Sequence, residues 1–470
     1  MSSQRHSQGT AASPTKLSAG TVWRYATGSL GTGGFGTLPG LVLLFYMTDT
    51  LGVAALAAGI VVAIPKAWDV VISPVIGGLS DHGLATTGTR RKLMLIGSVS
   101  LPFAFALTFA VPAGLEPWIG AVWVLLAFLA ATTFFNLFQV PYLALPTELT
   151  HSYHERTRLL TTRIVVLTFS ILLFGAGAPM IRARFSDNPN LGYLVMAIFA
   201  AVLIGVSLVV SSFVAPRGKP TGRSGTQSRA LAASHYKEAL ATLRESQPFR
   251  ALITTFTLQS IAIGMMLAGA QYVAKWVLHN ENAVTPLFAA LIAPALIAAP
   301  LWRLVAKRIG KERAYRVASW VFIAATILLL GMIWAPGWWI LGPVALTGAA
   351  YAGVQALPLA MLPDVIGHDS TQAITIINEE TGGAESNRGG AFTGVWSSFE
   401  MTASAVASIV LTLALGLSGY VESTGTQTVE QPASAVLGVS LSFSLIPAVL
   451  MIVSLFSLSR YRLREADITA

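Results

Sequence analysis

Long apolar stretches limit what this chain can fold into more than any other feature of its sequence. A helix needs about 20 apolar residues to cross the hydrocarbon of a bilayer, and stretches of this length alternate with polar segments along the 470 residues. Only 11% of the residues are charged, whereas a soluble domain carries about 25%. The sequence therefore predicts an all-α membrane protein with twelve transmembrane helices, at residues 21–47, 54–80, 93–113, 118–146, 160–181, 191–214, 250–276, 284–306, 314–335, 338–363, 391–418 and 434–458.

The longest polar segment divides the predicted helices into two sets of six. A weak repeat relates the sets: "QVPYLALPTELT" (139–150) and "QALPLAMLPDVI" (355–366) each carry two prolines five apart and then a carboxylate. Duplicated halves around a midplane site are a common transporter plan. We expect a disordered cytoplasmic N-terminus at 1–20, two pseudo-symmetric six-helix bundles at 21–214 and 250–458, a cytoplasmic linker at 215–249 and a cytoplasmic tail at 459–470.

Basic residues cluster on one side of the predicted spans, as in Arg90-Arg91-Lys92 and residues 307–313. Cytoplasmic loops are enriched in Lys and Arg, so we expect a multi-pass protein of the cell (inner) membrane with both termini in the cytoplasm. This topology accounts for the net charge of +9 without a nucleic-acid partner. The expected partners are the lipid bilayer, a small-molecule substrate and a coupling cation, and we expect a monomer.

Several chemistries are excluded or disfavoured by the residues present. The chain has no cysteine, which excludes disulfides, thiolate metal sites and cysteine nucleophiles. Its histidines lack metal-ligand spacing, and the sequence contains no HExxH, no GxSxG before a helix and no phosphate-binding loop. We expect no metal site and no cofactor other than a coupling H⁺ or Na⁺. A membrane enzyme or a receptor is the less favoured class of function.

The stretch "KAWDVVISPVIGGLSD" (66–81) places Lys66 and Asp69 inside a predicted span. Residues three apart share a helix face, and a charge at mid-membrane costs at least about 2.5–3.5 kcal/mol, so such groups normally face a cavity and pair. Two interpretations follow. The pair either holds helices together, or Asp69 binds the coupling cation or proton while Lys66 tunes it.

Motifs through most of the chain resemble one transporter family. "WDVVISPVIGGLSD" followed by "RRKLMLIG" resembles the loop between spans two and three of the major facilitator superfamily. More closely, the chain is similar to the glycoside–pentoside–hexuronide:cation symporters, of which melibiose permease is the familiar member. The similarity rests also on "LLFYMTDTLGV" (43–53), "ERTRLLTTR" (155–163), "ALPLAMLPDVIGHD" (356–369) and "GAFTGVWSSFEM" (390–401). It implies the major facilitator fold and a secondary active transporter that moves a small polar solute, a glycoside, sugar or sugar acid, by alternating access with a cation.

The family pattern carries over only in part. The family's cation site has two aspartates in span two; Asp69 matches the first, and Ser73 stands at the second. Gly33 and Gln139 stand where sugar-binding acids are found, whereas Arg163 is kept. A lone carboxylate suits a proton better than a sodium ion, so we expect proton coupling, with sodium as the alternative. The missing acids favour an anionic solute or, alternatively, an amphiphile such as a lysolipid.

Further polar and aromatic residues within spans are candidates for the substrate site because polar groups in a membrane face partners or water. Charged residues at the basic ends of spans are candidates for gating salt bridges, with Glu148 expected to pair with Arg156, and Asp364 with Lys307 or Arg308. The substrate-site candidates are Tyr25, Gln139, Tyr142, Arg163, Gln259, Gln271, Trp396 and Glu400, and the gating candidates are Asp81, Arg90, Arg91, Glu148, Arg156 and Asp364.

Overall fold

The computed structural model describes residues 16–150, 152–185, 187–216, 218, 246–380, 389–424, 429–461 and 463, with the side chains of 153, 368–391 and 393 excepted. Within these residues, twelve helical segments are long and apolar enough to cross a membrane, which confirms the predicted number. Most of the expected terminal segments and of the linker 215–249 lie outside the described residues. Their assignment, like the placing of the domain boundaries, stays a prediction.

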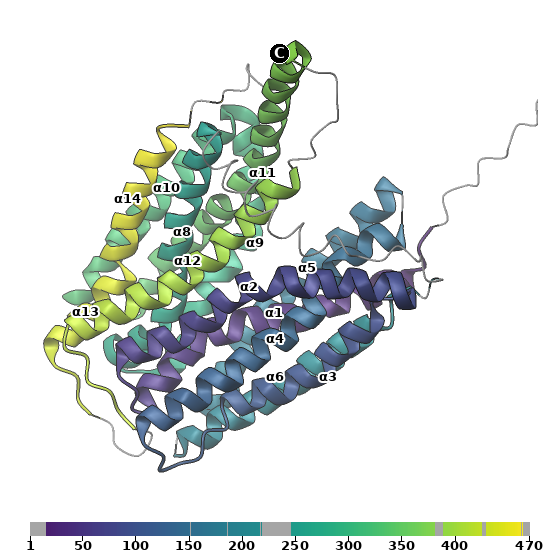
Figure 1. Ribbon diagram of the computed structural model, residues 1–470. Coiled ribbons are helices and arrows are strands. Elements are labelled where there is room, and N and C mark those ends of the chain that lie inside the picture. Colours follow the sequence, from purple (N-terminus) through teal and green to yellow (C-terminus); the bar gives the residue numbers. More distant parts are fainter. Residues whose placement is uncertain are drawn as a thin grey trace, which may run out of the picture.

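The N-terminal half has six long helices, drawn from purple to blue in Figure 1. Pro39, Pro65, Pro74, Pro141 and Pro146 lie inside these helices, as is tolerated in membranes, where neighbouring groups satisfy the freed carbonyls. The six helices are α1 (Ala19–Asp49), α2 (Ala55–Thr87), α3 (Arg91–Thr108), α4 (Pro117–Leu149), α5 (Tyr153–Ala183) and α6 (Pro189–Ser212).

The C-terminal half is less regular than its counterpart. Its last crossing, predicted as one helix, is broken at Ser444 into two shorter helices. The tenth crossing continues well beyond its predicted end at residue 363. Its elements are α8 (Gln247–Tyr272), η1 (Val273–Val277), η2 (Glu281–Ala283), α9 (Val284–Ile309), α10 (Lys311–Leu328), η3 (Leu329–Ile333), η4 (Trp338–Ile340), α11 (Leu341–Glu380), α12 (Gly389–Leu417), α13 (Ala433–Phe443) and α14 (Leu445–Leu458).

Within the described residues, the halves are joined mainly by three pairs of α-helices: α2 with α12, α5 with α9 and α1 with α8. Glycines allow two of these approaches. A Cβ on Gly59 would lie 2.1 Å from Oγ1 of Thr412, and one on Gly175 would lie 2.0 Å from the Phe288 ring. Small residues at helix contacts let backbones come close in membranes, where packing replaces hydrophobic driving force. The two halves therefore pack closely against each other at these glycines.

The two halves meet at one end and diverge toward the other (Figure 1). We call the meeting end the closed end; it carries the α1–α2 loop, at residues 50–54, and the described parts of the α12–α13 loop, at 418–424 and 429–432. There Leu51 and Thr424 form an antiparallel bridge between the halves. The other end carries Arg90–Lys92 and 307–313, and we call it the basic end. Side chains deep in the α2–α12 contact thus lie between the two halves.

Candidate functional site

Asp69 lies in a compact cluster of polar groups formed by α2 and α4. Asn136, on α4, donates its amide N–H to Oδ1 of Asp69. Ser73 Oγ lies 3.2 Å from the same oxygen, 2.7 Å from the Asp69 carbonyl and 2.9 Å from Oδ1 of Asn136. Asp69 and Ser73 are candidates from the sequence, whereas Asn136 is not, because the family pattern points to Gln139, one turn further along α4.

A hydrogen bond to α4 and two prolines mark the segment of α2 that carries this cluster. Trp68 Nε1 donates to Thr133 Oγ1 at 3.0 Å, which ties the same turn of α2 to α4. Pro65 and Pro74 bracket the segment, and each removes one helical hydrogen bond. The turns that carry Asp69 are therefore held to α4 by side-chain hydrogen bonds and have one helical hydrogen bond fewer toward each end of their own helix.

Lys66 faces the other half of the protein and not the lipid, as expected, but it does not form the ion pair considered from the sequence. Its Nζ donates to the carbonyl of Ser404, on α12, at 3.2 Å and to the hydroxyl of Ser404 at 2.5 Å. Within the described part of the chain, no salt bridge joins Lys66 to Asp69, whose Oδ1 is bonded to Asn136 and Ser73. The lysine thus bridges the halves, whereas the aspartate belongs to one of them.

Three of the substrate-site candidates come together in the N-terminal half. The rings of Tyr25 and Tyr142 stack at 4.6 Å, and the guanidinium carbon of Arg163 lies 5.6 Å from the Tyr142 ring centre. Tyr142 is fully used, since its hydroxyl donates to the Tyr25 carbonyl and bonds to Ser29. Among the described residues, the buried atoms Tyr25 OH, Arg163 Nε and Gln139 Oε1 have no hydrogen-bond partner. Buried polar atoms usually have a hydrogen-bond partner, so these three atoms are candidates to bind a polar solute.

The substrate-site candidates of the C-terminal half do not form one group in the way that Tyr25, Tyr142 and Arg163 do. Gln259 donates to Ser319 and Ser454, at 3.0 and 2.9 Å, and so connects α8 to α10 and α14 inside this half. Trp396 is buried against Phe256, with ring centres 4.3 Å apart. Gln271 is buried and Glu400 is exposed. Trp396 Nε1, both amide atoms of Gln271 and Oε1 of Gln259 find no partner among the described residues. The two hydrogen bonds that Gln259 donates nevertheless indicate a packing role.

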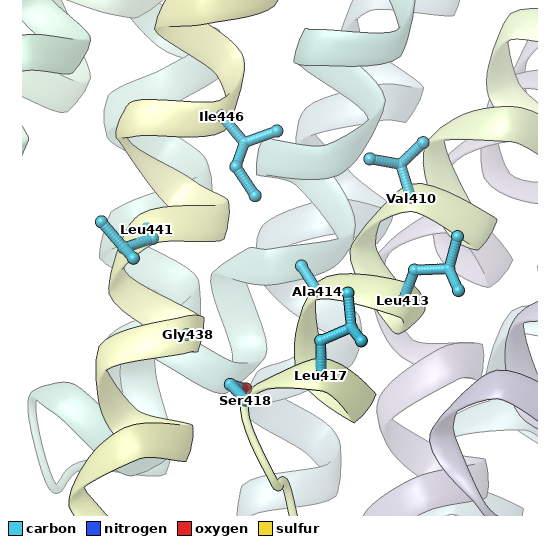
Figure 2. A pocket seen from close by; sticks show the side chains of 8 residues that line it. All are labelled: Val410, Leu413, Ala414, Leu417, Ser418, Gly438, Leu441 and Ile446. Carbon is cyan, nitrogen blue, oxygen red and sulfur yellow. The ribbon is translucent and has the colours of Figure 1, made fainter.

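One groove of about 450 Å³ lies apart from all these residues. It is formed by α12, α13 and α14, and Figure 2 shows its lining side chains. Leu417, on its edge, is 88% exposed, and Ser418 is the single polar residue in a lining otherwise made of Val410, Leu413, Ala414, Leu417, Gly438, Leu441 and Ile446. A small polar solute would find no polar group but this hydroxyl here, so the groove is not the candidate site.

The gating candidates pair within each half. Arg90 binds Asp81 at 2.7 Å and Glu148 at 2.5 Å, so Glu148 pairs with Arg90 and not with the expected Arg156. Burial opposes the charge of Arg90, but the hydrogen bonds of Glu148 and Asp81 outweigh it and raise the pKa of the guanidinium above its ordinary value. Arg156 donates to the Thr150 carbonyl at 3.4 Å.

The remaining two candidates also depart from expectation. The Arg91 guanidinium lies over the Phe213 ring at 3.9 Å. Asp364 pairs with Lys311 at 2.5 Å, in place of the expected Lys307 or Arg308. The first contact lies within the N-terminal half and the second within the C-terminal half. The pairs at the basic end therefore brace single halves and do not tie one half to the other.

The closed end holds a charged cluster that joins the halves and that the sequence did not reveal. Asp49, 4% exposed, lies 3.3 Å from Lys275 Nζ and accepts a 2.6 Å hydrogen bond from Tyr420. Glu281 links Lys275, at 3.5 Å, to Arg182, at 3.4 Å. We call these five residues the outer cluster. Burial raises the pKa of the Tyr420 phenol, and the Asp49 charge raises it further, which keeps the phenol a donor.

Backbone bonds reinforce the outer cluster. Ser423 N–H donates to the Thr48 carbonyl at 3.0 Å, and Ala55 N–H donates to Glu422 at 2.9 Å. The sequence signal for this cluster was faint, since Asp49 stands at the end of an apolar span. Arg182 and Lys275 lie outside the basic clusters of the sequence.

These features define a secondary transporter of the major facilitator type: twelve spans in two halves, with polar groups buried between them. Residues 24–465 match the MFS/sugar transport protein family, and the chain belongs to it. The predicted similarity to sugar–cation symporters is thereby confirmed.

Several known proteins are similar to the chain. It is 24% identical over 458 residues to a glucuronide carrier protein homolog of Escherichia coli, covering 96% of this chain and 94% of that one. It is 24% identical to a sodium-dependent lysophosphatidylcholine symporter of Danio rerio, covering 96% and 88%. An uncharacterized symporter of Synechocystis is 30% identical over 226 residues, and there the chain spans 42% of the relative. A crystal structure of a D-xylose-proton symporter shares the fold, with a TM-score of 0.67, 14% identity and coverage of 93% and 96%.

The pairs at the basic end allow a matched test of stability. Glu148 is 19% exposed and binds Arg90, which is 11% exposed, whereas Asp364 binds a Lys311 that is 45% exposed. We predict that Glu148→Gln lowers the free energy of unfolding by about 1.5–3 kcal/mol, the range for a hydrogen bond to a charged group. Asp364→Asn should cost less than about 1 kcal/mol, as for exposed pairs. Thermal unfolding of the two purified variants would measure this, and equal losses would contradict it.

Proposed function

We propose that this protein is a proton-coupled symporter that carries an anionic sugar or a related small polar solute across the cell membrane by alternating access. The observation that carries the proposal is the arrangement around Asp69. Its carboxylate is bonded within one half, one turn from a lysine that is bonded to the other half. A charge change at Asp69 therefore acts where the halves meet.

The orientation of the cycle follows from the charges. Basic loops face the cytoplasm in membrane proteins, so we assign the basic end to the cytoplasm and the outer cluster to the outside. In this assignment the halves are closed toward the outside and diverge toward the inside, which is an inward-facing state. The outer cluster then has to part each time the protein faces outward.

Proton coupling is favoured by the ligands available at Asp69. A sodium ion would have this carboxylate, the Ser73 hydroxyl and neutral oxygens such as that of Asn136. In the structure, however, the Asn136 N–H and the Ser73 hydroxyl point at the carboxylate as donors. An N–H donor turned toward Oδ1 is a poor neighbour for a metal ion. The same donors stabilise the ionised carboxylate, so it is burial of the carboxyl group that favours a proton. Desolvation in a low-dielectric environment favours the protonated form of a carboxyl group in general.

The substrate class is proposed from Arg163. Its Nε–H lies beside the stacked Tyr25 and Tyr142 and has no partner in the part of the chain that the structure describes, and arginine binds carboxylates and phosphates through paired donors. A glucuronide, which the Escherichia coli relative is named for, joins a sugar ring to a carboxylate. A lysophospholipid, the named substrate of the Danio rerio relative, joins a phosphate to an acyl chain and is the alternative.

The coupling ion can be tested without knowing the physiological solute. We predict that an acid-outside pH gradient drives accumulation of a radiolabelled glucuronide into sodium-free proteoliposomes, and that a protonophore abolishes it. Asp69→Asn should abolish gradient-driven accumulation but retain exchange of labelled for unlabelled glucuronide, because exchange needs no net proton movement. Glu430→Gln, in the α12–α13 loop, serves as the control. Accumulation that requires sodium and ignores the protonophore would refute proton coupling.

The role of Arg163 can be tested with a pair of probes. We predict that Arg163→Gln raises the half-saturation concentration for p-nitrophenyl glucuronide about tenfold to a hundredfold, because a hydrogen bond to a charged group contributes about 1.5–3 kcal/mol and each 1.4 kcal/mol is tenfold. Transport or competition by p-nitrophenyl glucoside, which lacks the carboxylate, should change little. Equal weakening of both probes would count against an anionic substrate. Competition by lysophosphatidylcholine but by neither sugar would favour the amphiphile.

A further inference from the structure

Lys66 has two alternative acceptors, one on each half of the protein. Its ammonium is bonded to Ser404, across the contact between α2 and α12. Asp69 lies three residues further along the same helix, where Cβ atoms are about 5–6 Å apart, a span that a lysine side chain can cover. The hydrogen bonds to Asp69 come from neutral groups of Asn136 and Ser73, so its negative charge is not balanced by them. Which acceptor Lys66 uses therefore depends on where α12 lies.

The depth of the Lys66–Ser404 bond makes it sensitive to opening of the closed end. At 1.5 Å per residue, Lys66 lies about 16 Å along α2 from its start at Ala55, and Ser404 about 20 Å along α12 from its end at Leu417. Nearer the closed end, the same two helices touch at Gly59 and Thr412. If the halves part there, α12 moves away from α2, and the ammonium loses both of its bonds. A charge left unpaired within the membrane is costly.

We propose that Lys66 is a positioning residue that switches between Ser404 when the halves are closed at the outer cluster and Asp69 when they are open. The proposal rests on the proposed function, in which Asp69 carries the coupling cation. A neutralised Asp69 offers Lys66 no counter-charge, so the ammonium stays on Ser404 and keeps the α2–α12 contact closed. Once the cation has left toward the inside, the carboxylate attracts Lys66 away from Ser404. The lysine then takes the place of the cation while the empty carrier turns outward.

The prolines of α2 and a hydrogen bond within α12 support such a switch. Pro65 precedes Lys66 directly and Pro74 follows Ser73, so the short segment between them has lost helical bonds at both ends. On the other side, the Ser404 carbonyl also accepts from Ser408 at 3.4 Å. When Lys66 departs, the Ser404 carbonyl therefore keeps a donor. Of these two groups, only the lysine ammonium needs a new partner.

A reporter cysteine at Thr412 tests the switch without substrate or ion gradient. Thr412 is fully buried against Gly59, and the chain has no native cysteine. In Thr412→Cys, labelling by a membrane-impermeant maleimide requires the α2–α12 contact to open. We expect Asp69→Asn to slow labelling about tenfold, which corresponds to about 1.4 kcal/mol. In a Lys66→Met background, the same Asp69→Asn change should alter the rate less than roughly twofold, because the alternative pair is already gone.

The dependence on Lys66 separates a switch from a merely structural bond. Equal slowing by Asp69→Asn in the presence of Lys66 and in the Lys66→Met background would overturn the proposal, as would no slowing in either background. Glu430→Cys, exposed in the α12–α13 loop, reports access of the reagent independently of conformation. Size-exclusion profiles identify variants that fail to fold, and Lys66→Gln then replaces Lys66→Met. Since this labelling needs no transport, its result stands whichever ion the uptake assay identifies.

Discussion

The cost of placing a charge between two halves of a membrane protein governs this structure. Each buried charge must have a partner, and in this protein several partners belong to the opposite half. Asp49 depends on Lys275 and Tyr420, and Lys66 depends on Ser404. These bonds exist only while the halves are closed at that end. The relative position of the halves therefore determines directly which buried charges have a partner.

The distribution of the pairs explains which parts move together. At the basic end, Arg90 gathers Asp81 and Glu148 inside the N-terminal half, and Lys311 holds Asp364 inside the C-terminal half. These pairs stiffen each half as a body. The outer cluster and the Lys66–Ser404 bond lie between the halves instead. Rigid bodies that separate along a polar contact are the arrangement needed for alternating access around a midplane site.

Much of the fold was predictable because a bilayer imposes a length on each apolar segment. The number of spans and most of their bounds followed from composition, and Asp69 with Ser73 followed from motif and spacing. Asn136 and the outer cluster were not predictable, since Asn136 meets Asp69 from another helix and Asp49 meets Lys275 from the other half. Partner choice also escaped prediction: Glu148 has arginines near it in sequence, yet the fold brings Arg90 to it.

The central claim is that the end closed by the outer cluster must open once in every transport cycle. Leu51 and Thr424 form a bridge there, and Cα atoms of antiparallel pairs are about 4.5–5.5 Å apart, within the range for a disulfide. The most direct measurement is glucuronide uptake by the double variant Leu51→Cys, Thr424→Cys under oxidising and reducing conditions. The account predicts that cross-linking abolishes uptake and that a reductant restores it, with each single cysteine variant unaffected. Full uptake by quantitatively cross-linked protein would contradict it.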